Sequence, residues 1–491
     1  MSFGNPAVLL AAVIAAACAL LAVKYWQRAL FGVFVLLVFE GALRKWVLPS
    51  AQAQIFLIKD VLLLAAYAGF LLDGRKNQTA LRGGAAIKIV LILSFVFGLL
   101  EVLNPSSPSI LVGLMGVKLY FLYAPVAFIL PYAFKSRDHL FDLIRRYLIM
   151  AIPVAVLGFI QIMAGPESSL NTYVSHTEEA TPLAQFGNEA LVRTSGTFSY
   201  IAGYTAFLSF VSFLAIGYNM ARGWRVKNNI APLLALTLVV GAMFTTGSRA
   251  PVYILVATAP VVLVMAVVGR VLTSQTAVRL FLLLPVIAIA ALNLSSRAVE
   301  GFAERVSTSG DAASTRIFAP LYQVTQVLSE GPALGMGIGT THPSALTIMG
   351  SDSFWWLHDL LVEEEMARVA VELGLMGLLL TGLLRVLIAV FALNCAMSFK
   401  DSAYRALGIG LMIYLALGIN SSAIFNATIG LYYWGALGLM LTMRRFEQLV
   451  EVERWLRRAG QRVGRKPPGL VSGKLTVNRA DGPSFGDRRG R

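Results

Sequence analysis

The chain has 491 residues, of which 57% are hydrophobic and 14% charged, and its mean hydropathy is +0.71. Soluble domains carry roughly 25% charged residues, so the composition excludes a soluble enzyme and indicates a polytopic membrane protein. The formal net charge of +15 is explained by basic residues in predicted short loops and in the C-terminal tail, so no nucleic-acid partner is expected.

The apolar residues gather into runs of about twenty residues, each long enough to cross the roughly 30 Å hydrocarbon layer as a helix. Backbone hydrogen bonds inside a membrane must be satisfied within the helix. The predicted fold class is therefore all-α: a polytopic transmembrane helix bundle of about 12–13 spans, with one long, partly helical extracytoplasmic loop. Hydropathy places the spans at 7–23, 28–43, 53–72, 86–103, 109–133, 142–164, 197–218, 229–245, 251–269, 279–295, 368–396, 403–420 and 423–442.

Basic residues are concentrated in alternate connections, which predicts the side on which each connection lies. Short loops rich in Lys and Arg stay in the cytoplasm, so the N-terminus is predicted outside and the C-terminus inside. The segments around 44–52, 104–108, 165–196, 246–250, 296–367 and 421–422 then face outward.

The predicted domain organisation is a membrane domain over 1–445, which contains the large loop 296–367, and a basic cytoplasmic tail over 446–491. The start of the tail carries apolar residues at helical spacing beside arginines, which indicates a helix on the anionic inner leaflet. The tail beyond Pro467 is expected to be disordered.

Five ionisable residues fall inside predicted spans, where a charge costs at least about 2.5 kcal/mol on insertion scales. They are Glu40, Lys59, Asp60, Glu101 and Lys118. Such residues usually face a cavity or a partner. One interpretation is a polar site in the outer half of the membrane, and the other is a set of interhelical ion pairs, such as Lys59 with Glu40 or Glu101. For Arg385, farther along the chain, snorkelling or a structural pair is expected.

Two arginines stand at predicted helix mouths on the outer side. Arg193 opens the run to Phe198, and Arg249 lies in the Gly- and Ser-containing turn from Thr245 to Pro251. Free N–H groups at a helix start and a guanidinium fork both suit phosphate oxygens. The pattern favours an anionic head group, with simple interfacial anchoring as the alternative.

The connection 296–367 is longer than a passive loop in a compact bundle. Apolar residues at helical spacing after Arg316 predict a short amphipathic helix that ends at Gly331–Pro332. Gly335 and Gly337 follow, where backbone N–H groups could approach a phosphate or sugar, although a plain turn fits equally. Next come two kinds of candidate: the aromatic residues Trp355 and Trp356, for stacking on sugars or for an interfacial belt, and the titratable His358, Glu363, Glu364 and Glu365.

In this order, the motifs resemble those of the O-antigen ligase and O-antigen polymerase family of bacterial inner membranes. That family has an Arg before a Gly-Thr-Phe element, as from Arg193 to Phe198, and a later Gly-Ser-Arg element, as from Gly247 to Arg249. Its long periplasmic loop carries an Arg, a Pro with a glycine cluster, and a Glu-x-Gly-x-x-Gly element. These places are taken by Arg316, by Pro332 with Gly335 and Gly337, and by Glu372 to Gly377. The resemblance covers roughly residues 190 to 385.

The resemblance implies a metal-independent glycosyltransferase without a cofactor. It would polymerise or ligate undecaprenyl-diphosphate-linked saccharide units on the periplasmic side of the inner membrane, in O-antigen or exopolysaccharide biosynthesis. Arg193, Arg249 and Arg316 would bind the diphosphate, and a base would deprotonate the acceptor hydroxyl. Further expected partners are membrane lipids and a chain-length regulator or export machinery.

The base itself is ambiguous. Glu363 stands nine residues before Glu372, where ligases of the family usually have a His, while His358 stands fourteen residues before it. His358 in a shifted register, Glu363 or Glu364 would serve. A polymerase fits somewhat better than a ligase. The alternatives from other classes are a transporter or flippase for a charged lipid-linked saccharide or solute, and a non-catalytic assembly scaffold.

Overall fold

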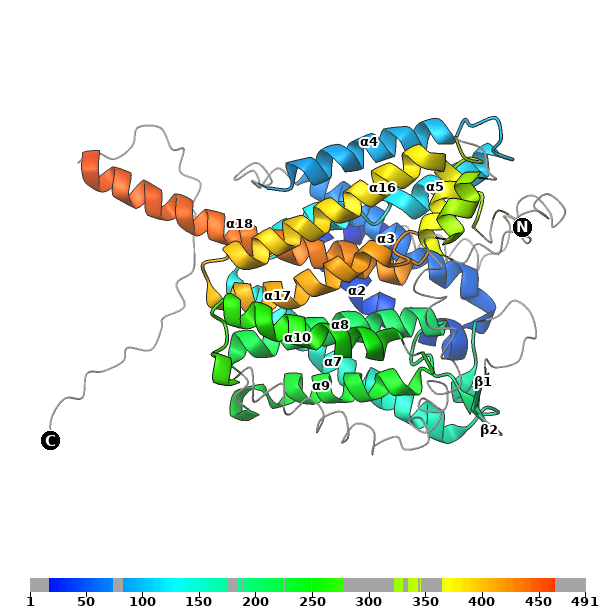
Figure 1. Cartoon of the computed structure of the whole chain (residues 1–491), viewed down its shortest axis with the longest axis horizontal. Coiled ribbons are helices and arrows are strands. Elements are labelled where there is room, and N and C mark those ends of the chain that lie inside the picture. Colours follow the sequence, from blue (N-terminus) through cyan, green and yellow to red (C-terminus); the bar gives the residue numbers. More distant parts are fainter. Residues whose placement is uncertain are drawn as a thin grey trace. The chain divides into compact units, whose positions relative to one another are not determined.

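A computed structural model describes residues 17–73, 83–174, 183–186, 189–223, 226–248, 250–276, 322–329, 334–342, 345 and 364–463. The chain forms two compact units, Met1–Glu447 and Gln448–Arg491, and each is considered by itself. In the first unit, long helices run side by side as a bundle (Figure 1). The predicted helical bundle is therefore confirmed.

The α-helices lie close to the predicted apolar runs. The α-helices are α2 (Trp26–Ala42), α3 (Gln52–Leu72), α4 (Ala85–Glu101), α5 (Ile110–Phe121), α6 (Pro125–Ala133), α7 (Arg137–Ala164), α8 (Ile201–Arg222), α9 (Val226–Thr245), α10 (Ala250–Val268), α16 (Glu365–Ser398), α17 (Ser402–Leu417) and α18 (Ala427–Val463). Short helical turns are η1 (Leu43–Val47), η2 (Pro49–Ala51), η4 (Ser169–Asn171) and η6 (Gly418–Asn420). One antiparallel hairpin, β1 (Leu183–Phe186) with β2 (Glu189–Val192), was not predicted.

Six helices in the described part of the chain are long and apolar enough to cross a membrane, judged by length and composition. They are Gln54–Leu72, Arg137–Ala164, Ile201–Arg222, Ala250–Val268, Glu365–Ser398 and Ser402–Asn420. The pair α5 and α6 would add a seventh, with a bend of 44° at a break where Pro125 begins α6. Pro lacks an N–H and suits a helix start. The predicted span 279–295 and most of 7–23 lie outside the described residues, so the count of 12–13 stays a prediction.

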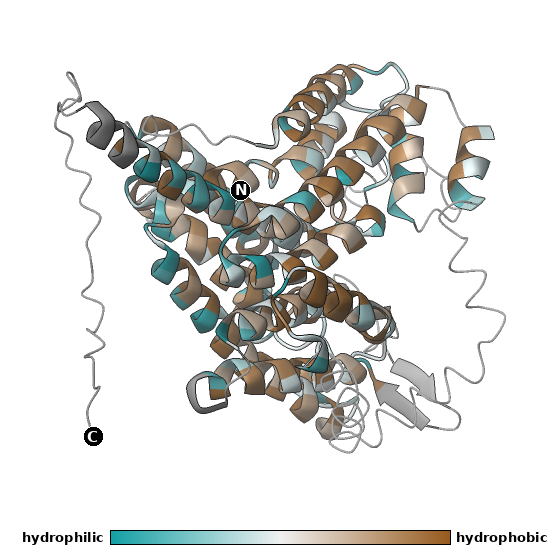
Figure 2. Ribbon diagram, turned by 60° about the vertical axis from the view of Figure 1, so that its left-hand side comes forward, coloured by the Kyte–Doolittle hydropathy of each residue, from teal (hydrophilic) through white to brown (hydrophobic). Residues whose placement is uncertain are grey.

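Apolar side chains face outward on many of these helices. Ile92, Leu93 and Val96 on α4 and Val256 and Val264 on α10 are each at least half exposed. Figure 2 shows that apolar residues cover most of the bundle's helices. Exposed apolar surface of this extent is not found on soluble monomers. It is what a multi-pass membrane protein presents to lipid.

The centre of the bundle is built on close helix contacts. Helix α8 packs against α17 and α9, and most of its residues are buried. A Cβ atom on Gly410 of α17 would lie only 2.3 Å from the Phe213 carbonyl oxygen of α8. Small residues at such crossings let two helix backbones approach, which is a common way of packing helices in membranes.

The helix α16 is broken near its start, and the break shapes the site described below. Gly374 has φ +60° and ψ −160°, a conformation that essentially only glycine adopts. Arg385 forms an ion pair with Glu365, although twenty residues of continuous helix would separate them by about 30 Å. The segment Glu365–Leu373 therefore folds back toward the helix that follows Gly374.

The connections gather at the two ends of the bundle as the alternation of basic loops predicted. Segments 43–51, 101–109, 165–174, 183–186, 189–200, 245–248, 334–342 and 418–426 lie at one end, toward the right of Figure 1, which we call the loop-rich end. The opposite end contains the ion pair of Arg137 with Asp401 and the hydrogen bond from Arg405 to the Gly269 carbonyl. Which end faces the cytoplasm stays a prediction.

The second unit is described only as far as Val463, where it continues α18 as a helix. Its side chains Val450, Trp455 and Leu456 are 44%, 67% and 45% exposed. The helical part of the predicted tail is thus present, whereas the segment beyond Pro467 lies outside the described residues.

Candidate functional site

The two arginine-containing motifs predicted on the outer side are in direct contact at the loop-rich end. The Thr194 amide donates to the Thr245 carbonyl at 3.2 Å, and the two threonine hydroxyls are 2.7 Å apart. Arg193 donates from Nε to the Thr246 carbonyl at 3.4 Å. The segment that begins at Arg193 and the turn that leads to Arg249 therefore form one structure. Arg249 itself lies outside the described residues.

The segment after Arg193 is hydrogen-bonded to α7. Gln161 accepts a hydrogen bond from the Gly196 amide at 2.8 Å and donates to the Gly196 carbonyl at 3.2 Å. Gly196 has φ +53°, and a Cβ atom there would lie 2.7 Å from the Tyr204 ring. Only glycine fits this turn, which explains why the Gly-Thr-Phe element begins with one.

Two cations from the N-terminal helices reach the same segment, and sequence analysis missed them. Arg44 donates to Ser199 Oγ at 3.0 Å, and Lys45 donates to Ser195 Oγ at 3.1 Å and to the Gly196 carbonyl at 2.8 Å. The sequence does contain a sign of them, because both lie in the predicted outward segment 44–52, and basic residues are unusual in outward loops.

The charges predicted inside the spans pair with each other. Glu40 contacts Lys59 at 3.0 Å, and Asp60 contacts Lys118 at 2.6 Å. Tyr123 also donates to Asp60 at 2.9 Å. The prediction of an interhelical pair between Lys59 and Glu40 is confirmed. The other predicted partner, Glu101, instead accepts a hydrogen bond from Asn104.

The glycine loop, residues 334–342, is bound to the folded-back start of α16. Glu372 is fully buried and accepts four hydrogen bonds: from the amides of Gly339 and Thr341 at 2.9 Å, from Thr341 Oγ1 at 2.6 Å and from Tyr120 Oη at 2.9 Å. The Gly337 amide donates to the Glu372 carbonyl at 2.9 Å. These N–H groups are directed at α16; the sequence had left open whether the glycines approach a phosphate or sugar or form a plain turn.

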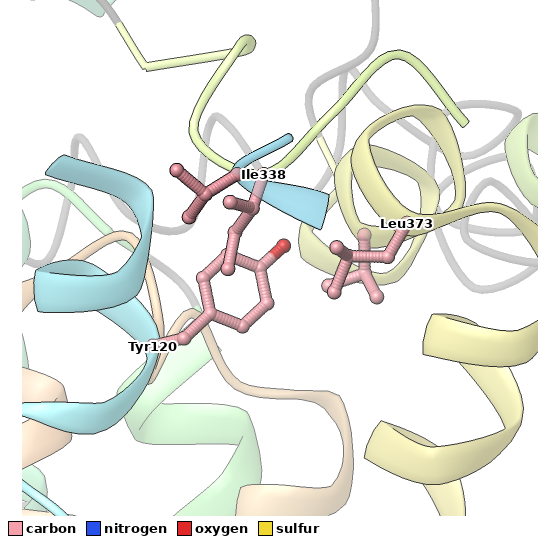
Figure 3. Packing of buried hydrophobic residues seen from close by; sticks show 5 residues of the cluster. Tyr120, Ile338 and Leu373 are labelled. Atoms are coloured by element: carbon pink, nitrogen blue, oxygen red, sulfur yellow. The ribbon is translucent and has the colours of Figure 1, made fainter. Parts of the chain in front are cut away.

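Close packing explains why the loop is rich in glycine. Gly335 has φ +81°, and a Cβ atom there would lie 2.5 Å from the Glu372 carbonyl oxygen. Beneath the loop, Ile338 packs with Tyr120 and Leu373 (Figure 3). The Glu-x-Gly element thus has two structural tasks, because Glu372 binds the loop and Gly374 breaks the helix.

A histidine of this loop was also missed by sequence analysis. Burial, together with the cations Arg368 and Lys118, lowers the pKa of His342 to about 4. Arg368 is anchored on the preceding residue, Thr341, by a 2.6 Å hydrogen bond to its carbonyl. The neutral imidazole can accept a proton, so His342 is a further candidate base, but its low pKa makes it a weaker base than a histidine whose pKa lies near the working pH. Its only signal in the sequence is its position just after the glycine cluster.

The remaining predicted site residues divide into two groups. Glu364 immediately precedes α16, and its amide donates to Gln323 Oε1 at 3.1 Å. Residues 322–329 form a helix that corresponds to part of the predicted amphipathic segment, with Val327 buried against α16. Outside the described residues lie Arg316, Trp355, Trp356, His358 and Glu363, as well as Arg249.

Comparison with models of protein families and with curated proteins found no match.

Proposed function

We propose that this protein is a metal-independent glycosyltransferase of the bacterial inner membrane. It would polymerise, or ligate, undecaprenyl-diphosphate-linked saccharide units on the periplasmic side, in O-antigen or exopolysaccharide biosynthesis. The observation that carries the proposal is the contact between the Arg193 segment and the turn 245–248. Two elements far apart in the sequence, one that begins at Arg193 and one that leads to Arg249, thereby meet at one end of the bundle, although Arg193 directly follows β2 and α8 begins only at Ile201.

The chemistry requires stabilisation of a leaving group. When the acceptor hydroxyl attacks the sugar, the bond to the lipid diphosphate breaks, and negative charge develops on that diphosphate. Guanidinium groups can bind phosphate oxygens with two parallel hydrogen bonds and so stabilise this charge. Arg193, Arg249 and Arg316 are assigned this role.

The acceptor hydroxyl must also lose a proton. The candidate bases from the sequence are His358, Glu363 and Glu364, and the structure adds His342. A carboxylate or a neutral imidazole serves equally in this step. Separate replacement of each candidate by its neutral isostere, with chain elongation as the readout, identifies the base.

A transporter or flippase for a charged lipid-linked saccharide is the second candidate. The observation in its favour is the set of ion pairs within the apolar helices, Glu40 with Lys59 and Asp60 with Lys118. Purified protein in liposomes that contain lipid-linked repeat units separates the two functions. Longer glycans identify an enzyme, and translocation without lengthening identifies a carrier.

Arg249→Lys is expected to abolish glycan lengthening in these liposomes while the protein is still inserted in the membrane. Lysine keeps the positive charge but loses the planar fork that binds two phosphate oxygens at once. The matched control is Arg222→Lys at the C-terminal end of α8, for which unchanged lengthening is expected. Normal glycan lengths from Arg249→Lys would contradict the assignment.

A further inference from the structure

Two consecutive cations are buried where α2 passes into η1. Arg44 is 7% exposed and Lys45 is 6% exposed. A buried charge is strongly destabilising unless a partner of opposite charge compensates it. Arg44 and Lys45 therefore need negatively charged or hydrogen-bond-accepting partners.

The hydrogen bonds of both side chains are incomplete. Arg44 Nε is buried and has no hydrogen-bond partner among the described residues. The Lys45 ammonium has three N–H groups, of which two are directed at Ser195 and Gly196. Arg44 thus retains an N–H group that a further acceptor can use, and Lys45 Nζ has as its remaining neighbour the Trp46 ring, whose centroid is 4.5 Å away.

The charge balance around them is positive. The site contains four cations: Arg44, Lys45, Lys59 and Lys118. In the described part of the chain, two carboxylates form ion pairs with them, Glu40 and Asp60. Glu40 is shared, because it lies 3.0 Å from Lys59 and 3.6 Å from Arg44. When Lys45 is protonated, two positive charges are left over, which suits an anion with more than one negative charge such as a diphosphate.

Phe56 on α3 lies beside three of these cations and is 36% exposed. Its ring centroid is 3.5 Å from Lys59 Nζ, 5.2 Å from the Arg44 guanidinium carbon and 5.6 Å from Lys118 Nζ. The ring therefore connects this group of cations to the exposed face of α3. Along the same helix, the side chains at i, i+4 and i+7 spacing are apolar and exposed: Leu57 by 49%, Val61 by 48% and Leu64 by 54%.

We propose that Arg44 and Lys45, with the 195–199 segment, form a binding site for the diphosphate head group of a prenyl lipid, whose chain lies along the exposed face of α3. The identity of the lipid rests on the proposed function. That the ligand is an anion rests on the buried cations alone. It gives the N-terminal helices a role in substrate binding beside the predicted arginines of the C-terminal half.

The test is binding of undecaprenyl diphosphate, inorganic pyrophosphate and undecaprenol to the purified full chain in detergent. Undecaprenyl diphosphate is expected to bind tightest and undecaprenol weakest, because the anion and the chain are both recognised. Equal binding of pyrophosphate and the lipid would identify a soluble diphosphate as the ligand and overturn the lipid assignment. No binding of either diphosphate to the unaltered protein would overturn the site.

Arg44→Gln and Lys45→Gln are each expected to weaken binding of undecaprenyl diphosphate about tenfold or more, because each removes a charge-assisted contact. The matched controls at the opposite end are Arg137→Gln and Lys88→Gln, which should bind like the unaltered chain. If a glutamine variant does not fold, two conservative variants replace it. Arg44→Lys should still weaken binding, since a lysine has no group that corresponds to the arginine Nε. Lys45→Arg should bind the lipid like the unaltered chain. Unchanged affinity in Arg44→Lys and in the folded glutamine variants would refute the assignment.

This test is separable from that of the proposed function. Loss of binding in the variants together with no glycan lengthening by the unaltered protein would contradict the glycosyltransferase and leave the binding site standing. Unchanged binding of the lipid by the variants, together with glycan lengthening by the unaltered protein, would contradict the site and leave the enzyme standing.

The affinity of this site should depend on pH. Lys45 lies beyond the predicted span 28–43, and burial lowers its pKa to about 7. A bound anion favours the ammonium form, so the pKa rises on binding. Below about pH 7 the ammonium already exists and affinity is constant, whereas above it each binding event must take up a proton. Affinity should then fall by up to about tenfold per pH unit.

The control for this pH dependence is Lys45→Gln, which should lose it. The other ionisable groups on the elements that pack against Lys45 are Arg44 on η1, Arg28 and Glu40 on α2, and Lys59, Asp60 and Tyr67 on α3, and the 194–199 segment carries none. All six remain in the variant. An unchanged pH profile in Lys45→Gln would show that one of them is responsible.

Discussion

Replacing Glu372 with glutamine is expected to release the glycine loop from α16 and to lower the free energy of unfolding by about 3 kcal/mol. One carboxylate oxygen accepts from the Thr341 amide and hydroxyl, and the other from the Gly339 amide and Tyr120. A glutamine presents an NH2 group to one of these pairs in either orientation. The hydroxyls can rotate, but one backbone N–H is left without an acceptor, at a cost of about 1–3 kcal/mol in addition to the lost charge-assisted bonds.

Hydrogen–deuterium exchange of the loop amides measures this effect locally. In Glu372→Gln, the Gly339 and Thr341 amides should exchange about a hundredfold faster, which corresponds to the expected free energy. The matched control is Glu167→Gln, because Glu167 is exposed. Unchanged exchange at Gly339 would mean that Glu372 does not hold the loop.

Replacing Arg385 with methionine is expected to destabilise the protein by about 3–5 kcal/mol, because the partner Glu365 is left buried without its cation. Both side chains of this pair are only 4% exposed. Glu365 also accepts hydrogen bonds from the Ile424 and Phe425 amides, and Arg385 donates to the Ile419 carbonyl. The pair therefore fixes the broken start of α16 to the connection between α17 and α18.

A double-mutant cycle separates the pair from the loss of a single charge. Glu365→Gln with Arg385→Met should recover part of the stability, because a glutamine oxygen can still accept from the two backbone amides. The exposed pair of Arg137 with Asp401, with side chains 50% and 31% exposed, is the control, and its loss should change stability by less than about 1 kcal/mol. If the melting temperature of the double variant is no higher than that of Arg385→Met, the instability of Arg385→Met does not come from the unpaired charge of Glu365.

The sequence predicted the helices well, because a run of about twenty apolar residues has few ways to satisfy its backbone in a membrane except as a helix. The pairing of Lys59 with Glu40 was also foreseeable, since an isolated charge in such a run needs a partner. The alternation of loops put the Arg193 segment and the turn at Thr245 at the same end, but it did not predict that the two are in contact.

The roles of individual polar residues were not foreseeable in the same way. Glu372 was expected only as part of a motif, and its four donors come from α5 and from a loop more than thirty positions earlier in the chain. The break at Gly374 falls inside a predicted continuous span, because hydropathy cannot register a single residue with positive φ. Arg44 and Lys45 fit no motif at all.

A bundle of apolar helices long enough to cross a membrane, with its connections grouped at two ends, was predictable from the sequence, since both features depend on local composition and on the length of apolar runs. Which charges are compensated and which are left over became visible only in the folded chain. Compensation depends on contacts between helices distant in the chain, and the free energy of a buried charge is set by the few polar atoms within hydrogen-bonding distance of it.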